Sequence, residues 1–316
     1  MARYALRRLL FVVPTLFGMS ILIFAMVRLL PGDVVDAMFT GEAGAAATAK
    51  QAIRKALGLT DPLPVQYIRF VGGVATGALG QSLTSGERVS AIMARALPIT
   101  VELAALAAVT ATAAGVPLGV LSAVRPNTAV DLAARVGGLI GLSVPNFWFA
   151  TLALLATSVF LHWTPPVTWI PPWRDLPANL AQMAIPALAI GVYLMATVMR
   201  MTRATMLEVL RQDYIRTALA KGAASRAVLF RHALRNALIP VITVIGFQVG
   251  TLIGGATIVE VIFGLPGMGY TLVQAIFARD YTVIEVAALL LALVFVLLNL
   301  AVDVLYGLLD PRIEQA

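Results

Sequence analysis

The chain has 316 residues, of which 60% are hydrophobic and 12% are charged, and its formal net charge is +7. A soluble domain carries about 45–50% apolar and roughly 25% charged residues, so this composition excludes an ordinary soluble protein and favours an integral membrane protein. The absence of cysteine excludes disulfides, and the two histidines, His162 and His232, are too far apart in the sequence to favour a metal site.

The N-terminus has the outline of a secretory signal, because Arg3, Arg7 and Arg8 stand before the uncharged run 9–27. That run exceeds the 7–15-residue apolar core of a signal peptide, and no small-residue cleavage site follows it. We therefore predict an uncleaved first transmembrane helix.

Five further apolar runs can each cross about 30 Å of hydrocarbon at 1.5 Å per residue. They are residues 103–124, 136–160, 176–199, 236–259 and 286–302. The chain is therefore predicted to be an all-α integral membrane protein with six transmembrane helices and both termini on one side. Its predicted parts are the N-terminus with helix 1 (1–30), an external segment (31–96) and a core of helices 2–6 (97–316).

The basic residues orient these helices. With the N-terminus inside, fourteen of the 23 Lys and Arg residues fall on the inner side, and eight of those fourteen lie between positions 200 and 235. Lys and Arg accumulate in cytoplasmic loops, which predicts an N-in, C-in topology. The same rule accounts for the positive charge without a nucleic-acid partner.

The external segment 31–96 contains two amphipathic pieces, 49–57 and 64–74, separated by Gly58 and by Asp61-Pro62. Glycine ends a helix and proline does not continue one, so two short helices are predicted. Nothing in the segment is catalytic. It is either a cap that packs on the membrane helices or a docking surface for a partner.

The loop 200–235 is predicted to form a helix that ends at Gly222 and a second helical run up to Asn236. A weak apolar face is formed by Tyr214, Ala218, Leu229 and Ala233. The loop is either a stiff lever on the cytoplasmic side or a solvated basic loop, and the residue pattern alone does not decide between them.

Four acidic residues, Glu102, Glu260, Glu285 and Asp303, fall within or beside predicted spans. A charge at the bilayer centre costs about 2.5–3.5 kcal/mol or more. For Glu260, Glu285 and Asp303, which are near span ends, solvation at the membrane interface is the favoured interpretation. Glu102 lies deeper in its helix and favours a packing or gating contact.

Several sequence blocks resemble one family. Residues 213–222 (DYIRTALAKG) and 231–240 (RHALRNALIP) are similar to the cytoplasmic signature loop of ABC transporter permeases, in the dipeptide/oligopeptide/nickel importer branch. Further blocks resemble this family, in the same order, at 30–33, 57–63, 66–67, 80–82, 259–269, 279–281, 299–303 and 310–313. The general pattern of this loop begins with Glu-Ala-Ala, whereas positions 216–218 read Arg-Thr-Ala and the proline arrives only at Pro240. The peptide branch carries this altered form.

The resemblance implies a type I ABC importer permease whose loop forms a coupling helix seated in a cleft of a separate ATPase subunit. The implied ATPase-coupling residues are Arg216, Thr217, Ala218, Ala220, Lys221, Gly222, Ala223, Ala224 and Arg226. Gly222 and the alanines would permit close docking, and the three basic residues would fix its register by charge pairing.

The fifth span has glycines at the i, i+4 positions Gly246, Gly250 and Gly254, a spacing that admits close helix packing. In the family that it resembles, this helix lines the translocation path, with a lid-like turn at 264–269. The implied path or gate residues are Gln248, Gly250, Gly254, Glu260, Pro266 and Gly267. A simple packing seam is the alternative.

The implied function is the permease of an ATP-driven importer of di- or oligopeptides, with nickel chelates or other small solutes as the alternative. Implied partners are a second homologous permease, two ATP-binding subunits, an extracytoplasmic solute-binding protein and inner-membrane lipid. We expect no catalytic role and no cofactor, because none of Lys50, Lys55 and Lys221 follows a glycine, as a phosphate-binding loop requires. A stand-alone secondary transporter or channel is the rival class, but no midplane carboxylates or inverted repeats are evident.

Overall fold

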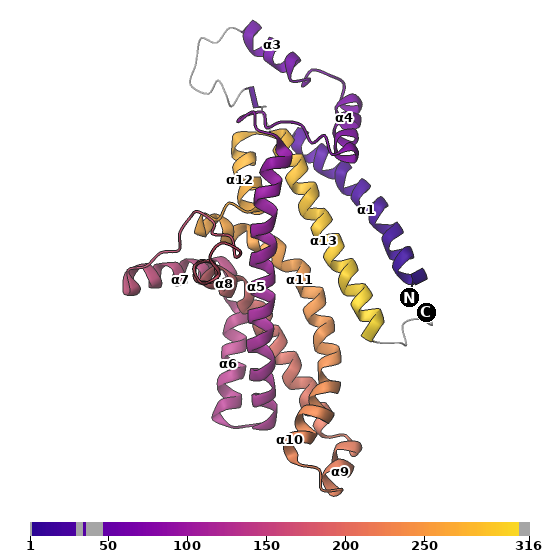
Figure 1. Ribbon diagram of the computed structural model, residues 1–316, viewed down its shortest axis with the longest axis vertical. Coiled ribbons are helices and arrows are strands. Elements are labelled where there is room, and N and C mark those ends of the chain that lie inside the picture. Colours follow the sequence, from indigo (N-terminus) through magenta and orange to yellow (C-terminus); the bar gives the residue numbers. More distant parts are fainter. Residues whose placement is uncertain (1, 30–33, 36–46, 310–316) are drawn as a thin grey trace. The chain divides into compact units, whose positions relative to one another are not determined.

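The computed structural model describes residues 2–29, 34–35 and 47–309 (Figure 1). Within these ranges, side chains are described from Leu10 to Val302. In that part of the chain the regular elements are helices, and the one strand-like feature is an isolated bridge between Gln81 and Arg88. The family-like blocks at 30–33 and 310–313 and the side chain of Asp303 lie outside the described residues.

The chain forms two compact units. Unit 1 comprises residues 100–265 and the chain from 298 onward, and unit 2 comprises residues 2–99 and 266–297. Each is built around its own buried apolar residues.

Unit 1 is centred on the long helix α8 (Leu176–Leu210), which buries Met183, Ile190, Leu194 and Met206 almost completely. The other elements of unit 1 are most of α5 (Val89–Val124), α6 (Ala129–Ser143), α7 (Asn146–Leu161), α9 (Asp213–Ala220), α10 (Ser225–Ala227), the π-helical turn η1 (Val228–Leu234), α11 (Arg235–Phe263) and the end of α13 (Tyr281–Leu309).

Glycines allow two helices to approach α8 closely. A Cβ atom on Gly119 of α5 would lie 2.6 Å from the Met199 carbonyl oxygen, and one on Gly141 of α6 would lie 3.2 Å from the Ala196 Cβ. Side chains at these positions would push the helices apart, so the α5–α6 hairpin packs on α8 through its small residues.

Unit 2 contains α1 (Ala2–Leu29), α3 (Ala47–Ala56), α4 (Leu63–Thr76), the start of α5, α12 (Met268–Ala278) and the first part of α13. Gly58 has a φ of +67° and ends α3, and Pro62 stands before α4. The two predicted amphipathic helices are thus confirmed, with boundaries shifted by one or two residues.

The third predicted span is wrong as a single helix. Residues 136–160 fall in α6 and α7, which meet at an angle of 105°, and Figure 1 shows α7 running crosswise to α6. Pro145 precedes α7 and cannot donate the backbone hydrogen bond that a continuous helix requires. Within the described residues, five single helices are long and apolar enough to span a membrane, and the α6–α7 pair makes a sixth if it counts as one broken span.

Several helices extend beyond their apolar runs. α8 has 35 residues, which at 1.5 Å per residue is roughly 52 Å, and it ends at Leu210 instead of near position 199. The added residues include Arg200, Arg203 and Glu208, which favour helix although they are polar. The hydropathy pattern marks the apolar stretch of a helix and not its end.

Candidate functional site

The loop that follows α8 is compact. The turn at Arg211 and Gln212 separates α8 from α9, and α9 is followed by Lys221, Gly222 and the short helical elements that lead into α11. Figure 1 shows α9 and α10 together at one end of unit 1. The predicted helix that ends at Gly222 is therefore confirmed.

Gly222 closes α9 with a Schellman motif. Its backbone φ is +81°, its N–H donates to the Leu219 carbonyl at 2.9 Å, and the Ala223 N–H donates to the Ala218 carbonyl at 3.2 Å. A Cβ atom at Gly222 would meet nothing within 4 Å. Within this chain, glycine is required by the left-handed backbone and not by close packing against another segment.

An apolar cluster anchors the loop to the helices of unit 1. Ile215 of α9 is 2% exposed and packs in one cluster with Met206 of α8 and with Val228 and Ala233 of η1. The predicted apolar face is therefore only partly right: Ala218 and Leu229 border this cluster, but Tyr214 is exposed. A helix turns 100° per residue, so Ile215, beside Tyr214 in sequence, occupies the inner face instead.

Most of the predicted coupling residues form the outer face of this loop. Ala218 and Ala223 are half-buried, whereas the others are exposed: Arg216, Thr217, Ala220, Lys221, Gly222, Ala224 and Arg226. Leu219, which was not among the predicted residues, adds an exposed apolar side chain to this face. We call the exposed residues between 216 and 226 the elbow face. Its small side chains, one exposed leucine and basic rim suit it to contact another protein.

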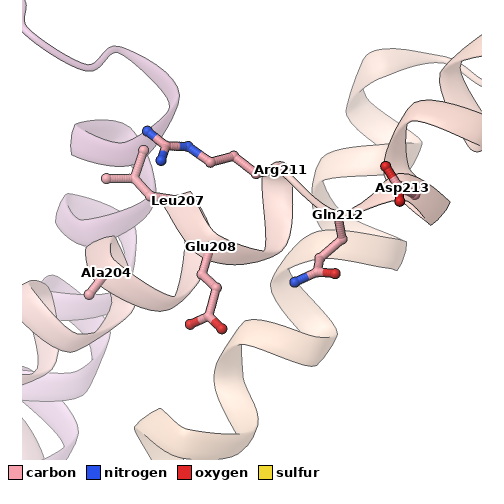
Figure 2. A pocket seen from close by; sticks show the side chains of 6 residues that line it. All are labelled: Ala204, Leu207, Glu208, Arg211, Gln212 and Asp213. Atoms are coloured by element: carbon pink, nitrogen blue, oxygen red, sulfur yellow. The ribbon is translucent and has the colours of Figure 1, made fainter.

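A pocket of about 480 Å³ lies where α8 meets α9. Figure 2 shows Glu208 and Gln212 directed to one side of the end of α8 and Arg211 to the other. The pocket lining is completed by Ala204, Leu207 and Asp213. Because it combines both signs of charge, it suits polar side chains better than an apolar ligand.

A partly buried ion pair lies near the same end of α8. Arg203 donates through Nε to Asp131 Oδ1 at 2.7 Å and through Nη2 to Asp131 Oδ2 at 3.0 Å. The Asp131 side chain is fully buried and also accepts from the Ser122 hydroxyl at 2.5 Å and from the Asn127 backbone N–H at 3.0 Å. Three polar groups, from α5, the α5–α6 turn and α8, thus meet at this carboxylate of α6.

The candidate path residues are divided between the two units. Gln248, Gly250, Gly254 and Glu260 lie along α11 in unit 1, whereas Pro266 and Gly267 belong to unit 2. A Cβ atom on Gly246 would collide with Val302 of α13, so the packing-seam alternative holds at that end of the stripe. Gly254 faces open space, and Gln248 is half-exposed.

Of the predicted turn at 264–269, residues 264–267 do connect two helices, since Gly264 ends α11 with a φ of +63°. Met268 and Gly269, however, are the first residues of α12 and are buried. These two residues are part of a helix and not of a loop.

Two of the acidic residues beside the spans, Glu260 and Glu285, are buried. Glu260 is fully buried and accepts from the Thr100 hydroxyl at 2.5 Å, and Glu285 is 5% exposed and lies 2.6 Å from Arg28. The prediction of interfacial solvation is wrong for both. Each carboxylate has found a partner more than 150 residues away, which a single-sequence pattern does not reveal.

Glu102 makes the packing contact that its position predicts. Its carboxylate accepts from Asn179 Nδ2 at 2.5 Å and from Trp169 Nε1 at 3.0 Å. Gln182, which is on α8 like Asn179, donates to the Thr168 carbonyl and accepts from the Ile170 N–H in the loop before α8. These buried amides fasten the 162–175 loop to unit 1.

In unit 2 the family-like blocks meet one another. Asp280 is 2% exposed and accepts from Ser82 Oγ at 2.5 Å and from Thr84 Oγ1 at 3.0 Å. Arg28 of α1 donates to Gln66 of α4 at 3.1 Å. These contacts tie the described part of the 31–96 segment to membrane helices.

Among the described residues, no group of three or more His, Cys, Asp or Glu side chains could hold a metal ion. The described helices indicate a helical membrane protein with several candidate spans. Solved structures support this class. The chain is similar to the MetNI methionine ABC transporter in an inward-facing conformation (TM-score 0.54, 18% identity, 69% of this chain and 96% of that chain). It is also similar to an amino acid ABC transporter (TM-score 0.53, 15% identity, 69% and 94%).

The sequence comparisons then fix the family. Residues 115–315 match the binding-protein-dependent transport system inner membrane component, and residues 1–104 match the N-terminal part of such membrane components. The chain belongs to this family of inner-membrane transport proteins.

Curated relatives match the chain along its whole length. It is 40% identical to the di/tripeptide transport system permease DppB of Pseudomonas aeruginosa, over 100% of this chain and 99% of the relative. The same identity and coverage are found with the dipeptide permease DppB of Escherichia coli K12. The oligopeptide permease AppB of Bacillus subtilis is 40% identical, over 99% of this chain and 100% of the relative.

Proposed function

We propose that this chain is the membrane-spanning permease of an ATP-driven importer of di- or oligopeptides. The observation that carries the proposal is the 40% identity, over essentially the whole length, to peptide permeases from three organisms. Peptide is the substrate class named for these relatives, and it is transferred here on the strength of that full-length similarity.

The geometry of the loop supports the mechanism. The elbow face is exposed, whereas the inner side of the same loop is packed on α5, α8 and α11 by the cluster around Ile215. A force applied to the elbow face is therefore transmitted through this packed cluster to α5, α8 and α11. The proposed source of that push is a separate ATPase subunit that binds and hydrolyses the nucleotide, so this chain has no catalytic role and needs no cofactor.

A second permease has a surface to pack against. One face of α11 is exposed and apolar, with Phe247 at 73% and Ile258 at 52% exposure and Thr251 and Gly254 between them. These residues recur every three or four positions and so share one side of the helix. We propose that this face, with Gln248 beside it, contacts the second permease and borders the translocation path.

The 31–96 segment is proposed to lie outside the inner membrane, with residues 97–316 as the transport core. The contacts of Gln66 with α1, and of Ser82 and Thr84 with Asp280 just before α13, support a cap that packs on the membrane helices. A cap can still present its outer surface to a solute-binding protein.

The proposed function is tested by reconstituting the chain in liposomes with its second permease, two ATPase subunits and solute-binding protein. We expect uptake of dialanine that requires ATP and every subunit. Uptake by the permeases alone without ATP would instead show a stand-alone transporter. ATP-dependent uptake of a nickel chelate in place of dialanine would keep the importer and replace the peptide.

A further inference from the structure

The Asp131–Arg203 ion pair lies close to the loop that carries the elbow face. Arg203 lies seven residues before Leu210, so about 10 Å of uninterrupted helix separates it from the end of α8. Helix α9, which carries part of the elbow face, begins three residues after that end, at Asp213. The ion pair therefore involves the helix that leads directly into the loop with the elbow face.

The partner of Arg203 belongs to a different hairpin. Asp131 is in the first turn of α6, and Ser122, which donates to the same carboxylate, is near the end of α5. The Arg203 guanidinium donates one hydrogen bond to each carboxylate oxygen of Asp131. Two parallel bonds fix both the distance and the relative orientation of α8 and the α5–α6 hairpin.

Asp131 is fully buried, and the Arg203 side chain is 22% exposed, so forming this pair removes much of both charged groups from water. That removal is costly, and well-packed apolar side chains of similar size often stabilise a fold equally well. The paired hydrogen bonds to Asp131 have fixed directions, which apolar packing lacks. They therefore suit a contact that keeps α6 and α8 in the same relative position when one helix is displaced along the other.

We propose that Asp131 and Arg203 form a positioning clamp that makes the α5–α6 hairpin follow α8 when the elbow is displaced. This inference rests on the proposed function, because it concerns the step between ATPase docking and rearrangement of the membrane helices. Without the clamp, α8 moves and the hairpin lags behind, so ATP is hydrolysed without productive transport.

The test measures ATP hydrolysis and dialanine uptake separately in the reconstituted complex. Asp131→Asn removes the charge, and Arg203→Lys keeps a charge but loses the two-pronged grip. We expect both variants to assemble with the ATPase and to raise the ATP hydrolysed per dialanine imported about fivefold or more, the lower end of coupling effects between sites. The effect of Arg203→Lys should be the smaller.

The matched control is Glu87→Gln, which breaks an ion pair of similar length with Arg95 in unit 2. Both side chains of that pair are exposed, so the substitution should leave the ratio of hydrolysis to uptake unchanged. It controls for loss of an arginine–carboxylate contact as such.

A disulfide offers a reversible rescue, because the chain has no cysteine of its own. Gly141→Cys and Ala196→Cys place Cβ atoms about 3.2 Å apart on α6 and α8, close to the separation of about 3.5–4.5 Å in disulfides. In the Asp131→Asn chain, oxidation should restore the ratio toward that of the unsubstituted chain, and reduction should abolish the rescue. The same cysteine pair in the otherwise unaltered chain controls for the cysteines and the redox treatment.

Distinct results separate this inference from the proposed function. Absence of ATP-dependent uptake in the unsubstituted complex would refute the function itself. Active transport together with a parallel fall of hydrolysis and uptake in Asp131→Asn, at an unchanged ratio, would reduce the pair to a structural contact and overturn the clamp. Failure of the oxidised disulfide to lower a raised ratio would also overturn it.

Discussion

Gly222 offers the sharpest test of the elbow, because backbone and steric effects can be separated there. Its φ of +81° supports the two hydrogen bonds that end α9, and a Cβ atom would meet nothing within 4 Å. A left-handed conformation costs an ordinary L-residue roughly 1–2 kcal/mol. Gly222→Ala therefore destabilises the turn by about that amount without any clash in this chain.

Gly222→Asn and Gly222→Trp complete the series. Asparagine tolerates the left-handed region, so Gly222→Asn should leave the elbow nearly intact. Gly222→Trp combines the backbone cost with a large ring on the elbow face. If the ATPase approaches this face closely, overpacking of about 1–3 kcal/mol weakens docking roughly 5- to 150-fold.

The assay is substrate-stimulated ATP hydrolysis by the assembled complex, together with co-purification of the ATPase from detergent. We expect the order Asn, Ala, Trp from mildest to most severe, with normal membrane insertion throughout. Substrate-stimulated hydrolysis at the normal rate in Gly222→Trp would refute the assignment of the elbow face as the docking site.

Further predictions concern contacts within each unit. Ile215→Ala should destabilise unit 1 by about 2–5 kcal/mol in thermal unfolding, whereas Leu219→Ala should leave stability unchanged and weaken ATPase co-purification; the reverse result would exchange the inner and outer faces of α9. Asp280→Ala should cost about 1–3 kcal/mol, seen as a lower melting temperature, because Ser82 loses its acceptor; an unchanged melting temperature would contradict the buried contact. Arg28→Leu should cost about 3–5 kcal/mol and be largely rescued by Glu285→Leu, since the second change removes the stranded charge; additive losses would show that the two side chains act independently.

Much of the architecture was predictable because lipid imposes simple rules on sequence. Long apolar runs and the cluster of basic residues at 200–235 predict the helices and the loop between α8 and α11. Gly222 was predictable as a helix end because a left-handed residue after a helix is commonly glycine. The break before α7 was also readable, since Pro145 interrupts the apolar run, but hydropathy alone does not register it.

The long-range ion pairs were not predictable in the same way. The Asp131–Arg203 pair joins residues 72 positions apart, and Asp131 on its own looks like an ordinary polar residue between two spans. The same holds for Arg28 and Glu285, which are 257 positions apart. Such partners are set by the fold, and an isolated sequence pattern does not indicate which charges will meet.

Cross-linking from the elbow tests the central claim most directly. Ala220→Cys supplies a single thiol on the exposed elbow face of a chain that has no other cysteine, and Thr76→Cys, exposed at the end of α4, supplies the matched control in unit 2. In the assembled complex in membranes, a short thiol-reactive photo-cross-linker at Ala220→Cys should join the permease to the ATPase subunit, and one at Thr76→Cys should not. Labelling of Ala220→Cys by a membrane-impermeant thiol reagent added outside intact cells, or no ATPase adduct in the assembled complex, would contradict the account.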